Sequence, residues 1–419
     1  MAEPAPTTRE RMRPQPVHVP PLPAPARRAK AVARTRTVVA FPTDRPTVRF
    51  QTPELPPMEE VLAYFGAAER ERFYSNGGPC ARLLADRMAL RLGGPTCVPV
   101  SSATHGLLVA LRAVLGRPEG QRRMVVTPSF TFTATACAID WAGFVPLSVD
   151  VDPDAWQLDP VALERALERH DGEVAGVLGC STFGSMPPRE VRTAWREISA
   201  AHGVPLLLDS AAAFGATDAT GGTAGALDEV EVFSFHATKP FAIGEGGMVT
   251  VPDAELAERV GRLINFGLDP ARGASFESGI NAKLSEIHAA TALAMLDRYD
   301  DVLARRRATA RRLQERMAGL PLRYQGGNAG STWQFLQLLL PTAAARAAAL
   351  EAAQLLGVQV RTCFDPPLHR HEAFAHAVTS DALAVTEDLA ARALSLPMAN
   401  ALEEWQIERI ALVVKEAVS

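Results

Sequence analysis

The 419-residue sequence lacks several features that would assign it to a particular class of protein. It has no apolar run near the roughly 20 residues that cross a bilayer, and its N-terminus has no apolar signal-peptide core. Its net charge is only −4, which implies no bulk attraction to nucleic acid or to an anionic membrane. We therefore expect a cytoplasmic protein with no nucleic-acid partner and no membrane partner.

Cysteine is also scarce. The five cysteines are odd in number, lie far apart and include no CxxC pair. A disulfide framework or a zinc site would need paired spacing. We therefore expect reduced thiols that pack as small core residues, and no metal site.

What is present fits a globular protein of two domains. The chain is 47% hydrophobic and 21% charged, and its length is comfortable for two cores. Residues 1–45 differ from the rest because Pro, Arg and Ala crowd them, so we expect a flexible tail there. We place a large α/β domain at 46–300 and a smaller α+β domain at 301–419.

Short apolar strands alternate with helices in the large domain. Strands are expected at 98–100, 124–126, 145–149, 174–178 and 205–208. Helices are expected at 80–92, 104–115, 160–169, 190–201 and 283–317. This alternation predicts a mostly parallel sheet with helices on both faces. In the small domain we expect strands at 333–340 and 358–361, and a closing helix at 403–417.

Two features of this pattern are typical of ligand sites at the ends of parallel strands. The sequence SSATHG at 101–106 joins a strand to a helix, and the helix N-terminus favours a phosphate. Asp209 follows a buried strand, where a carboxylate can pair with a cationic ring nitrogen. Each feature alone also fits a plain helix cap or turn.

Lys239 has an unusual setting for a lysine. It follows the apolar strand pattern VEVFSF and precedes the glycine-rich turn GEGG at 244–247. Most lysines are exposed on the surface, but an amine in this position can form an imine with an aldehyde cofactor. The sequence therefore makes Lys239 a candidate nucleophile.

Taken together, these residues resemble the DegT/DnrJ/EryC1/StrS family of sugar aminotransferases, which use pyridoxal phosphate (PLP) and have the aspartate-aminotransferase-like fold, type I. The resemblance covers about residues 75–419. Its motifs occur in order: SNGGP at 75–79, SSAT at 101–104, TPSFTF at 127–132, VDVDPD at 149–154, DSA at 209–211, FSFHATK at 233–239, NAKLSEI at 281–287, PLH at 367–369 and SLPM at 395–398.

The resemblance implies a role for each matching residue. Lys239 matches the lysine that binds PLP covalently and moves the proton, and Asp209 matches the acid that pairs with the pyridinium nitrogen. Phe132 matches the aromatic residue stacked on the ring. The residues that match phosphate contacts are Ala103, Thr104 and Ser234.

The resemblance also implies a partner. Asn281 and Lys283 lie in the stretch that, in this family, reaches the cofactor site of the neighbouring subunit. A homodimer with shared active sites is therefore expected.

One position departs from the family pattern. The family usually has Gln or His three residues after the ring-binding Asp, and this chain has Ala212. Alanine cannot donate a hydrogen bond, so one cofactor contact is missing. The presence of both Lys239 and Asp209 nevertheless favours retained catalysis.

The expected activity is transfer of an amino group from glutamate or glutamine to a nucleotide-linked keto sugar or to a related cyclic ketone. Such a product would serve a secondary metabolite or a surface glycan. Two alternatives stay open: different PLP chemistry, such as a lyase, an epimerase or carbon–carbon bond formation, and a non-catalytic relative. The substrate depends on loops such as 266–280 and 326–333, which the motifs do not specify.

Overall fold

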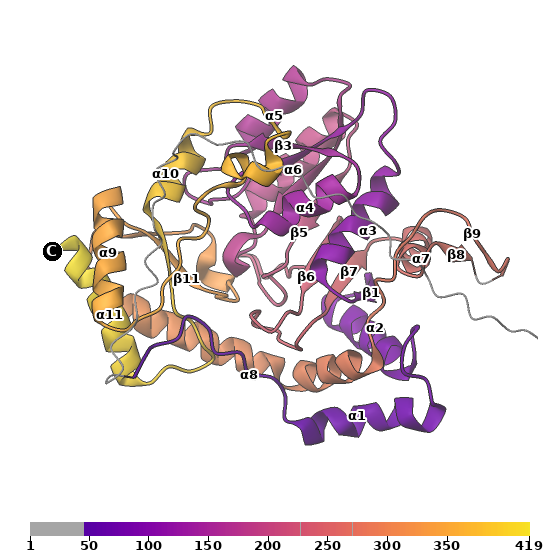
Figure 1. The fold of residues 1–419 in the computed structure, drawn as a ribbon, viewed down its shortest axis with the longest axis horizontal. Coiled ribbons are helices and arrows are strands. Elements are labelled where there is room, and N and C mark those ends of the chain that lie inside the picture. The colour runs from indigo at the N-terminus through magenta and orange to yellow at the C-terminus, as the bar shows by residue number, and fades with distance from the viewer. Residues whose placement is uncertain (1–45, 227, 270) are drawn as a thin grey trace, which may run out of the picture. The chain divides into compact units, whose positions relative to one another are not determined.

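The computed structural model describes residues 46–226, 228–269 and 271–419, so the expected flexible tail at 1–45 lies outside the described residues. An eight-stranded sheet occupies the centre, in the order β1-β7-β6-β5-β4-β2-β3-β12 (Figure 1). Its strands are β1 Thr96–Val100, β2 Met124–Pro128, β3 Val145–Val149, β4 Val174–Cys180, β5 Leu206–Asp209, β6 Val230–Ser234, β7 Gly247–Val251 and β12 Val378–Thr379. Strand β7 pairs antiparallel with β1 and β6, and the other pairings of this sheet are parallel, which confirms the expected mostly parallel sheet.

Helices cover both faces of this sheet. The α-helices of the described residues are α1 Met58–Glu71, α2 Pro79–Leu92, α3 Ala103–Leu115, α4 Thr133–Trp141, α5 Pro160–Arg169, α6 Arg189–Ala201, α7 Ala254–Leu263, α8 Glu286–Arg316, α9 Ala343–Leu355, α10 Ala384–Arg392 and α11 Glu404–Val418. Of these, α9 and α11 pack in a separate apolar core with the end of α8. Successive strand residues point to opposite faces. Val125 and Leu207 pack in the core with α3, α4 and α7, whereas their neighbours Val126 and Leu208 pack with α5 and α6. Both faces are apolar, which explains the continuous apolar strand patterns.

A second sheet of three antiparallel strands lies in the C-terminal part. Its strands are β10 Arg323–Tyr324, β11 Leu336–Leu339 and β13 Ala393–Leu396, and a third small sheet pairs β8 Leu268–Asp269 with β9 Ala274–Ser275. Helix α8 runs from α2 to α11 and passes through residue 300 (Figure 1). The division of the chain at residue 300 therefore stays a prediction.

The strand expected at 358–361 is wrong. Val358 and Arg361 form only single bridges, to Val48 and Ser395. Between these bridges the side chain of Gln359 accepts a hydrogen bond from the backbone of Phe50 at 3.1 Å, in place of a continued ladder.

All five cysteines are free thiols. Within the described ranges, no helix is long and apolar enough to cross a membrane. The cytoplasmic location stays a prediction.

A buried carboxylate joins two of the sequence motifs. The Glu286 side chain, at the start of α8, is completely buried. Its two oxygens accept hydrogen bonds from the backbone N–H groups of Cys80 at 2.6 Å and Ala81 at 3.2 Å, in the first turn of α2. Gly78 makes this approach possible, because a Cβ there would lie 2.6 Å from the Glu286 carboxyl carbon. Glu286 therefore caps α2 from a distant part of the chain.

Replacing this cap should destabilise the fold. Glu286→Ala leaves two buried N–H groups without an acceptor, so we expect the free energy of unfolding to fall by about 2–3 kcal/mol. Urea denaturation measures the change. The exposed Glu315 on the same helix provides the control variant Glu315→Ala. Equal stabilities of the two variants would contradict the capping role.

Candidate active site

Several strand ends meet at one edge of the central sheet. Strands β4, β5 and β6 are parallel, so Cys180, Asp209 and Ser234 mark the same edge. Strand β1 also ends there, because Val100 pairs with Gly247 at the start of β7. Ligands of open α/β sheets bind outside the carboxyl ends of the strands.

Lys239 lies in the tight connection between β6 and β7. Its backbone N–H donates to the carbonyl of His236 at 2.8 Å. Gly244 and Gly246, with φ values of 99° and 158°, allow the chain to return to the sheet. A Cβ on Gly247 would lie 2.9 Å from the Ala103 nitrogen, so this glycine lets β7 and the start of α3 approach closely.

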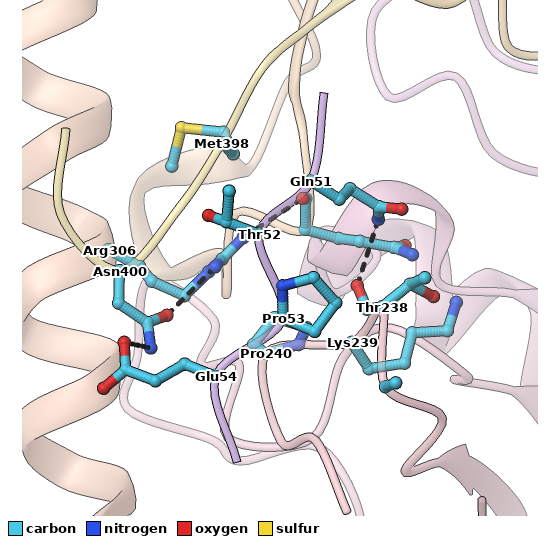
Figure 2. A pocket seen from close by; sticks show the side chains of 12 residues that line it. Gln51, Thr52, Pro53, Glu54, Thr238, Lys239, Pro240, Arg306, Met398 and Asn400 are labelled. Carbon is cyan, nitrogen blue, oxygen red and sulfur yellow. Dashed lines mark hydrogen bonds between the residues drawn. The ribbon is translucent and has the colours of Figure 1, made fainter. Parts of the chain in front are cut away.

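A pocket beside Lys239 is formed by segments far apart in the sequence (Figure 2). Its wall includes residues 51–54, Arg306 of α8, and Met398 and Asn400. Figure 2 shows the Gln51 side-chain amide directed at the carbonyl of Thr238, at 3.1 Å. This hydrogen bond holds residues 51–54 against Thr238, which directly precedes Lys239.

The buried guanidinium of Arg306 fixes another wall of this pocket. It donates to the carbonyl of Trp333 at 2.7 Å and to the Asn400 side-chain oxygen at 3.1 Å. Asn400 in turn donates to Glu54 at 2.8 Å. Burial lowers the pKa of Arg306 to about 10, so it stays protonated at neutral pH.

Asp209 is almost buried, with 8% of its surface exposed. The Thr135 hydroxyl donates to its Oδ2 at 2.7 Å, and the Ala211 N–H donates to its Oδ1 at 3.2 Å. Burial raises the pKa of Asp209, whereas these two hydrogen bonds and the charge of Lys239 lower it. The raising effect of burial is the larger one.

Lys239 and Asp209 influence each other electrostatically. Burial lowers the pKa of Lys239 to about 8, although the negative charge of Asp209 acts in the opposite direction. At neutral pH an appreciable fraction of the amine is therefore uncharged and able to act as a nucleophile.

The start of α3 offers backbone donors at the same edge. The Ser102 hydroxyl caps the helix by accepting from the His105 N–H at 3.2 Å. Among the described residues, no hydrogen bond uses the N–H groups of Ala103 and Thr104. Ser234 is 8% exposed, and its hydroxyl accepts from the His236 N–H at 3.3 Å. Free N–H groups at a helix N-terminus suit an anion.

Phe132, Asn281 and Lys283 lie near these elements. Phe132 directly precedes α4, and 63% of its surface is exposed. Lys283 donates to the Asn265 side chain at 2.8 Å. Asn281 lines a separate cavity of about 280 Å³, together with Thr104 of the same chain. Within one chain, Asn281 and Lys239 therefore line different cavities.

Ala212 is buried and has no polar side-chain atom. Its backbone carbonyl accepts from the Thr332 hydroxyl at 2.7 Å, so that hydroxyl is already engaged. The neighbouring Gly184 is required here, because a Cβ would lie 2.1 Å from the Thr332 oxygen.

Sequence reasoning missed Thr135, Gln51 and Arg306. Thr135 lies three residues after Phe132, and no spacing rule pointed to Asp209 as its partner. Gln51 precedes the first motif, and Arg306 is one of many arginines on a long helix. Only the folded chain brings them to the edge where Lys239 lies.

The residues present fit PLP. An amine with a lowered pKa suits an aldehyde, a buried carboxylate suits a protonated ring nitrogen, and free N–H groups at the start of α3 suit a phosphate. The site contains one member of each kind at a single sheet edge.

Comparisons with known proteins agree with this chemistry. Residues 58–415 match the model of the DegT/DnrJ/EryC1/StrS aminotransferase family. Protein Rv3402c of Mycobacterium tuberculosis is 35% identical over 376 residues, which is 89% of this chain and 90% of that protein. GDP-perosamine synthase of Caulobacter vibrioides is 30% identical over 321 residues, 75% of this chain and 82% of that protein.

A solved structure supports the fold. DesI, crystallised in the presence of its TDP-sugar product, is 32% identical, with a TM-score of 0.80. The match covers 90% of this chain and 94% of DesI. The expected fold class, type I of the PLP enzymes, is confirmed.

The lowered pKa of Lys239 can be measured. We expect competitive acetylation, followed by mass spectrometry on protein freed of bound small molecules, to find half of the Lys239 amine neutral at about pH 8. Asp209→Asn removes the charge that raises this pKa, so its midpoint should fall further. Exposed Lys415 on α11 serves as the reference peptide. A midpoint near the ordinary lysine value of about 10.4 would contradict the burial of the amine.

Proposed function

Since the chain belongs to the DegT/DnrJ/EryC1/StrS aminotransferase family, we propose that it moves an amino group from glutamate or glutamine to a nucleotide-linked keto sugar. The reaction class is that of a PLP-dependent aminotransferase acting on keto sugars. The observation that carries the proposal is the combination of Lys239, with its lowered pKa, and buried Asp209 at one sheet edge. A role in secondary-metabolite or glycan synthesis accords with such a product.

Each cofactor contact is assigned to a residue of this edge. The N–H groups of Ala103 and Thr104 and the Ser234 hydroxyl would hold the phosphate of PLP, and Asp209 would hold its ring nitrogen. The exposed ring of Phe132 would cover one ring face. When bound, PLP supplies an aldehyde that condenses with amines and a ring that accepts negative charge from carbon.

Lys239 is the proposed acid and base. With PLP bound, the Nζ of Lys239 would accept a proton from the α-carbon of the amino donor and would later deliver a proton to the former ketone carbon of the acceptor. A pKa of about 8 suits both directions at neutral pH, because neither form of the amine is rare. Asp209, while ionised, stabilises the positive charge of the ring nitrogen.

Two comparisons support a nucleotide-linked acceptor. One relative is named for a GDP-linked amino sugar, and DesI was crystallised with a TDP-sugar product. A related cyclic ketone is the second candidate acceptor. Ala212 removes one expected contact to the cofactor, and the presence of both Lys239 and Asp209 favours retained catalysis. The family match favours transamination over lyase, epimerase or carbon–carbon bond-forming chemistry.

Loss of the amine should abolish the reaction. We expect the purified protein to be yellow and to release 2-oxoglutarate from glutamate, or the corresponding keto acid from glutamine. In Lys239→Ala the covalent link cannot form, so the protein-linked visible absorbance should vanish and turnover should fall by several orders of magnitude. Lys415→Ala is the control. Normal transamination by Lys239→Ala would exclude the assignment, and turnover of donor without keto-acid release would favour one of the other PLP reactions.

We further propose a homodimer in which Asn281 and Lys283 of one subunit complete the cofactor site of the other. Asn281 and Lys239 line different cavities in one chain, which is compatible with roles in two sites. The resemblance implies that Asn281 and Lys283 reach the cofactor site of the neighbouring subunit, and we assign them to that site in the partner copy.

Mixing two defective proteins tests the shared site. Lys239→Ala and the double variant Asn281→Ala, Lys283→Ala should each be impaired. A mixed dimer has one intact site, so we expect subunit exchange to restore activity, up to about a quarter of the wild-type value from the statistics of random pairing in closed dimers. Sedimentation confirms the oligomeric state. No gain on mixing dimeric variants would show that each chain builds its own site.

A further inference from the structure

The carboxylate of Asp209 is held in a setting that opposes its charge. Burial raises its pKa, and the groups that lower it are the Thr135 hydroxyl, the Ala211 N–H and the charge of Lys239. A protonated Asp209 would lose its attraction for a cationic ring nitrogen. The charge of Lys239 depends on the protonation of its amine, whose pKa is about 8. The two hydrogen bonds do not depend on that charge.

Thr135 makes the shorter of these two bonds. Its Oγ1 lies 2.7 Å from Asp209 Oδ2, compared with 3.2 Å from the Ala211 nitrogen to Oδ1. The Thr135 side chain is completely buried in the first turn of α4, so water does not compete for it. A hydrogen bond to a charged acceptor in such surroundings is roughly twice as strong as one between neutral groups.

The direction of the Thr135 proton is fixed by Asp209. An ionised carboxylate can only accept, so the Thr135 hydroxyl donates to Asp209. Its oxygen is then free to accept from the Thr131 hydroxyl at 3.2 Å and from the Cys180 thiol at 3.9 Å. Burial raises the pKa of Cys180 well above its ordinary value, so the thiol keeps its proton and adds no negative charge. Thr131 and Cys180 therefore donate to Thr135, and Thr135 donates to Asp209.

We propose that Thr135 is a positioning residue, which holds Oδ2 of Asp209 and keeps this carboxylate ionised toward the ring nitrogen of the cofactor. The proposal rests on the proposed pairing of Asp209 with that nitrogen. Thr131 supports Thr135 from behind by satisfying its oxygen. Neither threonine touches the reacting atoms.

The test compares cofactor affinity and its pH dependence in a series of variants. Thr135→Val keeps the shape of the side chain and removes the donor. We expect the dissociation constant for PLP, from equilibrium dialysis, to rise about tenfold to a hundredfold. The pKa of Asp209 should rise, so the cofactor should be lost at a higher pH when a holoenzyme is titrated toward acid and followed by its visible absorbance.

Matched variants separate this role from a packing role. Thr135→Ser restores the hydroxyl and should restore both the affinity and the pH midpoint. If Thr135→Val folds poorly, Thr135→Ala takes its place, because it also lacks the donor and should show the same weaker affinity and higher pH midpoint. The control is Thr250→Val on β7, a buried threonine that donates to the carbonyl of Glu231 at 3.3 Å. It should change the melting temperature without moving the pH midpoint.

Asp209→Asn separates failure of this inference from failure of the proposed function. If Asp209→Asn binds PLP poorly and Thr135→Val behaves like Thr250→Val, the role of Thr135 is refuted while the pairing of Asp209 stands. If Asp209→Asn binds PLP as the unaltered protein does, the pairing itself is wrong, and the role of Thr135 falls with it.

Discussion

The parallel pairing of β4, β5 and β6 is the constraint on which the site depends. It brings Cys180, Asp209 and Ser234 to one edge, and the tight return to β7 adds Lys239 there. Both faces of these strands are covered by apolar packing, so a slip in register would misplace the carboxylate and bury the wrong side chains. The chemistry of the edge is therefore set by the same contacts that stabilise the sheet.

Burial acts in opposite senses on the two ionisable groups of the site. It favours the neutral form of the Lys239 amine and also the neutral form of the Asp209 acid. The proposed reaction uses a neutral Lys239 amine but an ionised Asp209. Two hydrogen bonds that Asp209 accepts oppose the effect of burial on its pKa, although burial remains the larger influence. An apolar site can therefore hold a carboxylate only where hydrogen-bond donors, here Thr135 and Ala211, face it.

Much of this arrangement follows from the sequence. The apolar runs predict β3 and α5 at their observed bounds, and they predict that Asp209 lies at the carboxyl end of a parallel strand. The strand at 358–361 was wrong, because its pairing depends on two partners distant in sequence, Val48 and Ser395. For the same reason local patterns missed Thr135, Gln51 and Arg306. A hydrogen bond between residues 74 positions apart, such as that from Thr135 to Asp209, leaves no periodic trace.

The pocket beside Lys239 is closed by contacts that join the two ends of the described chain. Gln51 binds the Thr238 carbonyl across 187 positions, and Asn400 binds Glu54 across 346. A ribosome makes residues 51–54 long before residue 400, and contacts of such separation form late. Lys239 is synthesised well before its pocket can be complete. The pocket around this lysine therefore stays incomplete on the nascent chain until residue 400 has emerged.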